Sequence, residues 1–138
     1  MEREKYNSFV KHVELNKIVL YKLDSQFNYE LLGRESGQVL VDFKPSFNLK
    51  RKEENKFLAE ARFSVSVKVE ESNEELIKIN ASFLLFYSLK EKCDDDILEE
   101  FIKRNVPLNA WPYGRELISS MTSRMGLPAL NIGLYKVY

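Results

Sequence analysis

Apolar and polar residues alternate along two neighbouring stretches of the chain. Every odd position from 57 to 69 is apolar, and so is every odd position from 77 to 89. A period of two is typical of β-strands that have one buried face and one solvent-exposed face. The polar segment 71–74 lies between the two runs. The pattern therefore predicts a long β-hairpin with its turn at these polar residues.

Two further strands are expected ahead of the hairpin. Apolar residues alternate over 39–49, but Pro45 interrupts this run and cannot donate to a sheet ladder, so the strand should lie at a sheet edge or bulge there. The earlier strand covers 13–23. Its predicted buried face consists of Val13, Leu15, Val19, Tyr21 and Leu23. The intervening segment 24–37 is too long for a hairpin turn and carries apolar residues, which favours a packed crossover.

The last third of the chain has the spacing of helices. A first helix is expected to begin at the acidic run 94–96 and to end at Pro107. A second helix is expected to begin near Pro112, which a first turn tolerates, and to end at Gly126 and Pro128. Its apolar stripe consists of Tyr113, Leu117, Ile118, Met121 and Met125. Strands followed by helices predict an α+β fold.

The charge balance and the cysteine content exclude several classes of protein. The 138 residues include 21 Lys and Arg and 21 Asp and Glu, so the formal net charge is zero and nucleic acid is not the expected partner. Cys93 is the only cysteine, so no intramolecular disulfide is possible. The first 15 residues have no apolar core of a signal peptide, and the apolar run 83–87 is too short to span a bilayer. We expect a cytoplasmic protein with no membrane insertion.

The sequence offers no constellation for catalysis. His12 is the only histidine, and one histidine with one cysteine makes no zinc site. No phosphate-binding loop and no set of nucleophile, base and oxyanion donors is recognisable. The acidic run 94–96 is adequately explained as the start of a helix, although a cation remains an alternative. We therefore expect no enzyme, no cofactor and no metal; a small-ligand binding sheet is an alternative without a supporting polar cluster.

One segment carries a specific resemblance. Residues 111–124, WPYGRELISSMTSR, followed by 127–132, LPALNI, resemble the signature helix and the strand-like tail of the SecB chaperone family. Outside 109–132 the chain matches that family only in the order of its elements. The family helix motif and oligomer interface are carried over to Pro112, Gly114, Arg115, Glu116, Leu117, Met121, Arg124 and Pro128.

The resemblance implies a fold and a function. It implies one domain over 1–138, with a four-stranded antiparallel Greek-key-type sheet, a long crossover loop and C-terminal helices packed on one face. It also implies a dimer of dimers (a homotetramer) and ATP-independent holding of unfolded polypeptides, in protein export among other settings. The client groove is carried over, by element, to Phe27, Tyr29, Leu31, Leu32, Phe43, Phe47, Phe83, Leu85, Trp111 and Tyr113. Simple completion of the core is an equally good explanation for six of them: Phe27, Tyr29, Leu31, Leu32, Trp111 and Tyr113.

One feature bears on which of the family's partners this chain could bind. Exporting members present acidic residues on the outer face of the sheet to the motor SecA, whereas the corresponding positions here are Lys17, Tyr21 and Lys78. Charge reversal opposes the same docking. The alternative is a partner-specific chaperone or antitoxin module, of the kind attached to toxin–antitoxin pairs and not coupled to SecA.

Gly114 inside a helix further predicts close approach of another helix or strand.

Overall fold

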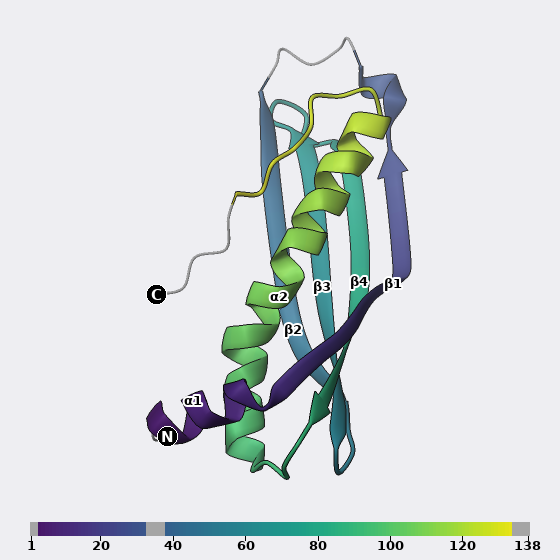
Figure 1. The fold of residues 1–138 in the computed structure, drawn as a ribbon. Helices are drawn as coiled ribbons and strands as arrows, with labels where there is room; N and C mark the ends of the chain where they lie inside the picture. Colours follow the sequence, from purple (N-terminus) through teal and green to yellow (C-terminus); the bar gives the residue numbers. More distant parts are fainter. Residues whose placement is uncertain (1–2, 33–37, 134–138) are drawn as a thin grey trace.

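Four antiparallel strands form one sheet in the computed structural model, which describes residues 3–32 and 38–133. The strands are β1 (Val13–Phe27), β2 (Val39–Lys52), β3 (Lys56–Val69) and β4 (Glu75–Leu89), in the spatial order β1-β4-β3-β2. All four predicted strands and the hairpin of β3 and β4 are confirmed. Because β1 pairs with β4 at one edge while β2 lies at the other, the chain crosses the sheet between them in a Greek-key-type connection (Figure 1).

The two faces of the sheet follow the predicted alternation. The odd-numbered residues of β3, and those of β4 from Ile77 onward, face the helix α2 and are buried. We call this side the helix face and the opposite side, which carries the even-numbered residues of β3 and β4, the outer face. The short 3-10 helix η1 (Tyr29–Leu31) follows β1, so Phe27 belongs to the strand rather than to the crossover. Residues 33–37 of the expected crossover lie outside the described residues.

A single helix, α2 (Asp95–Arg124), replaces the two helices that the sequence predicts. Pro107 does not end the first of them, and Pro112 does not begin a second; both prolines lie inside α2. Each proline removes one backbone hydrogen bond from the helix. That cost is offset because the buried side of α2 continues through this region: Val106, Pro107 and Ala110 are all fully buried. Tertiary packing overrides the local stop signal.

Gly114 confirms the prediction of a close approach, and the neighbour is a strand of the same chain. A Cβ atom at this position would lie 2.6 Å from Cζ of Phe63 on β3. A real Cβ would not tolerate that distance without movement of the ring. The absence of a side chain at Gly114 therefore allows α2 to pack directly against the Phe63 ring.

The end of α2 is capped as predicted. Gly126 has a φ of +78°, and its N–H donates to the carbonyl of Ser123 while the N–H of Leu127 donates to the carbonyl of Thr122. These two bonds are the pair that defines a Schellman motif. Residues 127–132 then pack across the helix face without forming the strand that the resemblance implies. The hydroxyl of Thr122 accepts a 2.9 Å hydrogen bond from the N–H of Leu130 and fixes the segment.

The N-terminal helix α1 (Arg3–Lys11) was not predicted. Its apolar residues have helical spacing at Tyr6, Phe9 and Val10, which is the signal that the sequence offered. The rings of Phe9 and Phe101 meet edge to face at 5.7 Å, and the Tyr6 hydroxyl bonds Asn105 on α2. The helix α1 thus packs against the first half of α2.

The predicted buried face of β1 is wrong in part. Two register shifts against β4, between Leu15 and Lys17 and between Leu20 and Lys22, each insert an extra residue into β1. A bulge shifts all later side chains to the other face. Val19 pairs with Leu84 of the outer face and therefore lies there, whereas Leu20 pairs with Phe83 and lies on the helix face.

Candidate functional site

The helix α2 covers only part of the helix face. It contacts β2, β3 and β4, and Figure 1 shows it crossing the sheet diagonally. Apolar side chains remain exposed on both sides of it. The β1 strip consists of Leu15, Leu20 and Leu23, with 36%, 42% and 44% of each residue exposed. The β2 strip consists of Val39, Val41 and Leu49, with 40%, 47% and 43% exposed.

The β1 strip is continuous with α2 through one buried ring. Leu20 is the cross-strand neighbour of Phe83, and the rings of Phe83 and Tyr113 meet at 6.2 Å. Tyr113 stands on α2 with 48% of its surface exposed. Leu20, Phe83 and Tyr113 thus form an apolar row from the sheet edge to the helix. Beyond the end of β1, Tyr29 and Leu32 add exposed apolar surface at 70% and 47%.

The β2 strip borders a cavity of about 530 Å³ between β2 and the first half of α2. Its apolar lining includes Phe47, Leu49 and Ile102, and its rim carries Asp95 and Glu99. An extended segment of polypeptide passing along β2 would find room for an apolar side chain there. The cavity and the two strips make the helix face a surface with several shallow apolar positions.

The residues predicted for a client groove fall into three groups. Tyr29, Leu32 and Tyr113 are exposed. Leu31, Phe83 and Leu85 are buried in the core, with at most 5% of their surface exposed, so they support the surface from beneath and do not line it. The half-buried members are Phe27, Phe43, Phe47 and Trp111.

Three of the half-buried rings surround Phe63. Phe43 stacks on Phe63 at 6.2 Å, and Phe47 and Trp111 meet it edge to face at 6.0 Å. The indole N–H of Trp111 donates a 3.0 Å hydrogen bond to the carbonyl of Gly133. Aromatic pairs of this kind contribute about 0.5–1.5 kcal/mol beyond the area they bury. The cluster therefore joins β2, β3 and α2 and is chiefly structural.

The residues of the helix motif lie on different sides of α2. Gly114 faces β3, and Leu117 and Met121 are partly buried against the core. Pro112, Glu116 and Arg124 are exposed, Arg115 is half-buried, and Pro128 is exposed in the segment beyond the helix. The exposed members are available for contacts with a second copy or a partner, whereas Gly114 serves the packing of its own chain.

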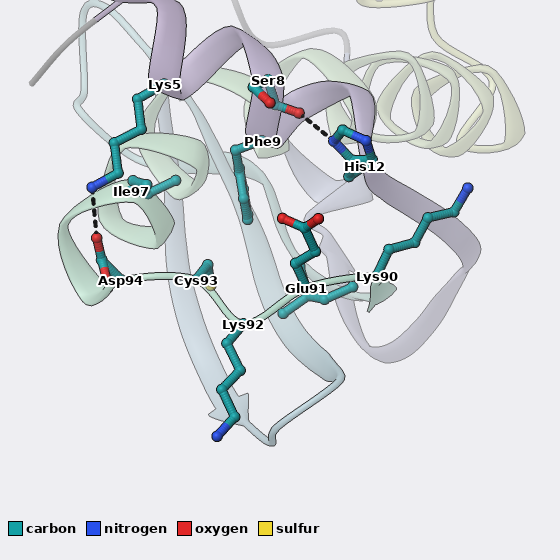
Figure 2. Close-up of a pocket in the computed structure, with 11 residues that line it drawn as sticks. Lys5, Ser8, Phe9, His12, Lys90, Glu91, Lys92, Cys93, Asp94 and Ile97 are labelled. Atoms are coloured by element: carbon teal, nitrogen blue, oxygen red, sulfur yellow. Dashed lines mark hydrogen bonds and ion pairs between the residues drawn. The ribbon is translucent and has the colours of Figure 1, made fainter.

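A second cavity, of about 240 Å³, lies between α1 and the start of α2 (Figure 2). Two pairs of its polar groups are engaged with one another: Lys5 pairs with Asp94 at 2.8 Å, and Nδ1 of His12 lies 2.7 Å from the Ser8 carbonyl. The side chains of Lys90 and Lys92 extend away from the cavity. These contacts fasten α1 to the chain and present no set of convergent groups for chemistry.

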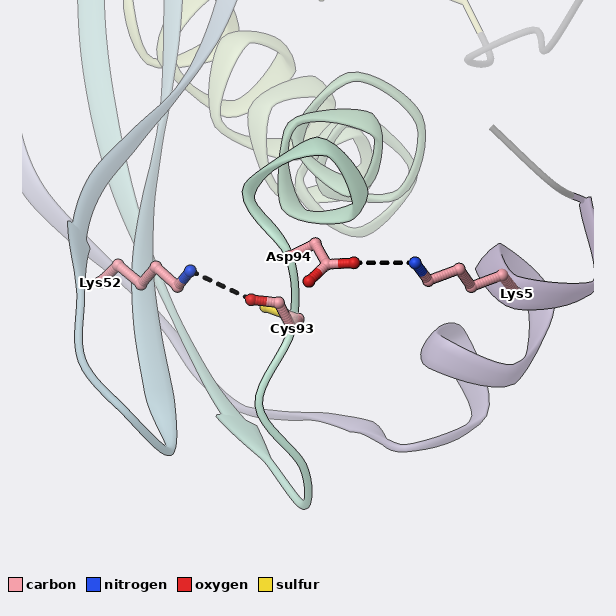
Figure 3. A network of polar contacts seen from close by, with 4 residues as sticks. All are labelled: Lys5, Lys52, Cys93 and Asp94. Carbon is pink, nitrogen blue, oxygen red and sulfur yellow. Dashed lines mark hydrogen bonds and ion pairs between the residues drawn. The ribbon is translucent and has the colours of Figure 1, made fainter.

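The start of α2 is held from both sides, as Figure 3 shows. Lys5 of α1 pairs with Asp94, while Lys52 of β2 donates to the Cys93 carbonyl at 3.2 Å and to Asp95 at 2.8 Å. The hydrogen bond from Lys5 lowers the pKa of Asp94, and the bond to Asp95 raises the pKa of Lys52. The acidic run 94–96 therefore lies at the start of a helix as predicted, and two of its carboxylates accept hydrogen bonds from lysines.

The perturbed side chains are structural rather than reactive. Burial raises the pKa of Tyr87 to about 12, and its hydroxyl accepts a 2.9 Å hydrogen bond from Asn109. Burial also raises the pKa of the Cys93 thiol, which disfavours the nucleophilic thiolate. Within 3–32 and 38–133, no three His, Cys, Asp or Glu side chains are placed to share a metal ion. No helix in the same ranges is long and apolar enough to cross a membrane.

The sequence did not reveal most of the exposed apolar residues. Leu20 was missed because strict alternation from Val13 onward assigns it to the polar face. The run Ile18-Val19-Leu20 was the available signal, since three consecutive apolar residues in a strand place apolar groups on both faces. Val39, Val41 and Leu49 were predicted only as alternating apolar residues of a strand, and the structure leaves them 40%, 47% and 43% exposed.

Solved structures that match this fold include two neighbours. The SecB-like chaperone Rv1957 of Mycobacterium tuberculosis, in complex with a ChAD peptide from the antitoxin Rv1956 HigA1, matches with a TM-score of 0.81 over 96% of this chain and 98% of that chain. A protein of unknown function from Streptococcus agalactiae matches with a TM-score of 0.53 over 88% and 97%. Both are 11% identical to this chain. No protein-family model and no curated protein sequence matches. The chain has the fold of a SecB-like chaperone.

Proposed function

We propose that this protein is a chaperone of the SecB-like family that holds extended apolar segments of polypeptide on the helix face of its sheet, without ATP. The observation that carries the proposal is the β1 strip. Three leucines of β1 face the same side of the sheet beside a helix, each more than a third exposed. Contiguous exposed apolar surface of this kind marks a binding site. The fold neighbour from Mycobacterium tuberculosis was solved with a bound peptide, which supports the same use.

The energetics require several contacts at once. Burying a leucine completely contributes roughly 1.5–3 kcal/mol. The exposed fractions of Leu20 and Leu23 are 42% and 44%, so covering each side chain contributes about 1 kcal/mol. Micromolar affinity needs about 8 kcal/mol after ordering costs. A client must therefore engage the β1 strip, Tyr113, Tyr29 and Leu32 together, and the β2 strip offers a second run of contacts.

The test is suppression of aggregation by the double variant Leu20→Thr/Leu23→Thr. Threonine keeps the preference for a strand but removes most of the apolar surface. Loss of about 2 kcal/mol corresponds to roughly 30-fold weaker client binding. Light scattering of a thermally aggregating client, without nucleotide, should show suppression by the natural protein and little by the variant.

The control is Leu40→Thr, which makes the same change at a leucine that is 52% exposed on the outer face of β2. It should leave suppression intact. If the natural protein fails to suppress aggregation at several-fold molar excess, the holdase proposal is wrong. If Leu40→Thr is as defective as the double variant, the assignment to the helix face is wrong.

A partner-specific chaperone or antitoxin module is the second candidate. Its support is the antitoxin peptide bound to the fold neighbour. Delivery of clients to SecA is not part of the proposal, because Lys17, Tyr21 and Lys78 occupy positions where exporting members are acidic. Either of two results would favour the second candidate over a general holdase: a toxin pair encoded next to this chain, or co-purification with one protein only.

We further propose that the chain acts as an oligomer, as the resemblance implies. Among the described residues, no further strand pairs with the outer edge of β1 or of β2, and open edges together with exposed apolar strips favour association. The exposed residues of the helix motif, Pro112, Glu116 and Arg124, are the expected contributors to an interface between copies.

A further inference from the structure

The outer face of the sheet carries a cationic band that the holdase proposal does not use. Cross-strand pairing places Lys17, Phe86, Leu58 and Arg51 in one row across the four strands. The next row is Val19, Leu84, Glu60 and Asn48, and the third is Lys22, Ser82, Arg62 and Ser46. Four cations thus border a central set of apolar side chains. We call these three rows the outer band.

Three cations of the outer band have no acidic partner. Within the described part of the chain, Lys17, Lys22 and Arg51 make no ion pair, and all three are exposed. Lys17 and Lys22 instead lie against rings, with Nζ of Lys17 4.9 Å from the centre of the Phe86 ring and Nζ of Lys22 5.3 Å from that of Tyr21. Contact with a ring face does not neutralise a cation, so the charge of each lysine can still attract a ligand.

The only carboxylate of the band is buried and neutralised. The side chain of Glu60 is 3% exposed, Nε of Arg62 lies 3.0 Å from its Oε1, and the Tyr21 hydroxyl bonds its other oxygen. A partner therefore meets the charge of Lys17, Lys22 and Arg51 without a competing surface acid inside the band. Arg62 remains 55% exposed and offers its other guanidinium N–H groups.

A shallow cavity adjoins the first row. It has a volume of about 230 Å³, and Phe86, Leu58 and Arg51 line it together with Asn16 and Asn55. That volume suits one apolar side chain, while the amides and Arg51 suit acceptors on either side of it. The band is three strand spacings wide, about 14 Å, which an extended chain spans with about four residues.

We propose that the outer band docks an acidic polypeptide segment, in which carboxylates surround one aromatic or aliphatic side chain. Charge complementarity selects the acids, and the cavity beside Phe86 accepts the apolar residue. A polypeptide fits better than a nucleic acid because Glu14 and Asp24 of β1 lie in the rows that adjoin the band and Glu53 lines the cavity beside Phe86. These acids interrupt the positive surface and would repel a continuous phosphate backbone. This docking is independent of client holding, which uses the opposite face of the sheet.

The experiment measures fluorescence polarisation of a labelled octapeptide that has four Glu or Asp residues around one phenylalanine. The natural protein should bind it, and binding should weaken several-fold between 50 and 300 mM NaCl because the contacts are ionic and exposed. The variant Lys17→Glu/Lys22→Glu should bind at least ten-fold more weakly. The neutral variant Lys17→Gln/Lys22→Gln should bind the peptide with an affinity between those of the natural protein and the charge reversal. It replaces the charge reversal in the test if that variant unfolds.

The matched control is Lys11→Glu/Lys90→Glu, which changes the net charge equally at two exposed lysines outside the band. It should alter affinity by less than three-fold. The proposal is overturned if the acidic peptide does not bind at 1 mM protein or binds the control and the reversal equally weakly. It is also overturned if a lysine-for-acid version of the peptide, or a single-stranded oligonucleotide, binds as tightly.

Discussion

Gly114→Ala tests the packing of α2 on the sheet, because two opposing effects have sizes that can be compared. Alanine is favoured over glycine inside a helix by about 1 kcal/mol. At Gly114 the added Cβ would lie 2.6–2.7 Å from three atoms of the Phe63 ring. Phe63 is 1% exposed and is enclosed by Phe43, Phe47, Phe83 and Trp111. The ring therefore has nowhere to move.

Overpacking a rigid core costs about 1–3 kcal/mol, and here the upper part of that range applies because the clash involves a whole ring edge. The net expectation is that Gly114→Ala lowers the free energy of unfolding by about 1–2 kcal/mol. The urea midpoint should fall by about 0.5–1 M for a chain of this size. Unfolding should be followed by far-UV circular dichroism at one fixed protein concentration, since association would shift the midpoint.

Two further variants separate the clash from helix propensity. Ser123→Ala lies on an exposed position of the same helix and should raise stability by a few tenths of a kcal/mol. In a Phe63→Leu background the cost of Gly114→Ala should shrink by about 1 kcal/mol, because the ring is gone. A Gly114→Ala protein as stable as the natural one, or more so, would refute the packing argument.

The remaining predictions concern pH and assembly. Burial raises the pKa of Tyr87 to about 12 and that of Tyr6 to about 12, above the ordinary value of 10, so the neutral phenols stabilise the fold below pH 10 and this contribution is lost as the pH rises toward 12. The melting temperature should therefore drop between pH 10 and 12, less steeply in Tyr87→Phe; equal slopes would contradict the assignment. Size exclusion with light scattering should return a multiple of 16.2 kDa, and a mass of about 16 kDa would contradict the oligomer.

The strands were predictable because their environment is regular. Along β3, and along β4 from Ile77, each odd residue faces α2, so burial repeats every two positions and the sequence shows it. Val13 and Leu15 of β1 follow the same rule. Between the two bulges the predicted face is wrong, because the bulges depend on how β1 pairs with β4 and no residue type marks their position; beyond the second bulge, Leu23 is on the helix face as predicted. Val19 and Tyr21 are therefore on the outer face.

The helical region shows the opposite problem, a strong local signal that tertiary contacts overrule. Pro107 predicts the end of a helix, yet it is buried inside α2 because Val106 and Ala110 pack on the sheet beside it. Gly126, by contrast, is required only for the local backbone conformation that ends α2, and the predicted helix end is confirmed there. The candidate site depends on which apolar residues α2 leaves uncovered. Tyr29, Leu32 and Tyr113 were predicted, whereas Leu20 and Leu23 became candidates only once the diagonal course of α2 was known.

The bulges of β1 have a consequence for a protein that displays so much apolar surface. A straight, complete strand at the border of a sheet is a template on which further chains can stack without limit. Here one border is kinked twice, at Leu15/Lys17 and Leu20/Lys22, and the other holds Pro45, which supplies no amide hydrogen. Growth from either border is thus interrupted within a few residues. The molecule can expose leucines on one face of its sheet while resisting conversion into a fibre.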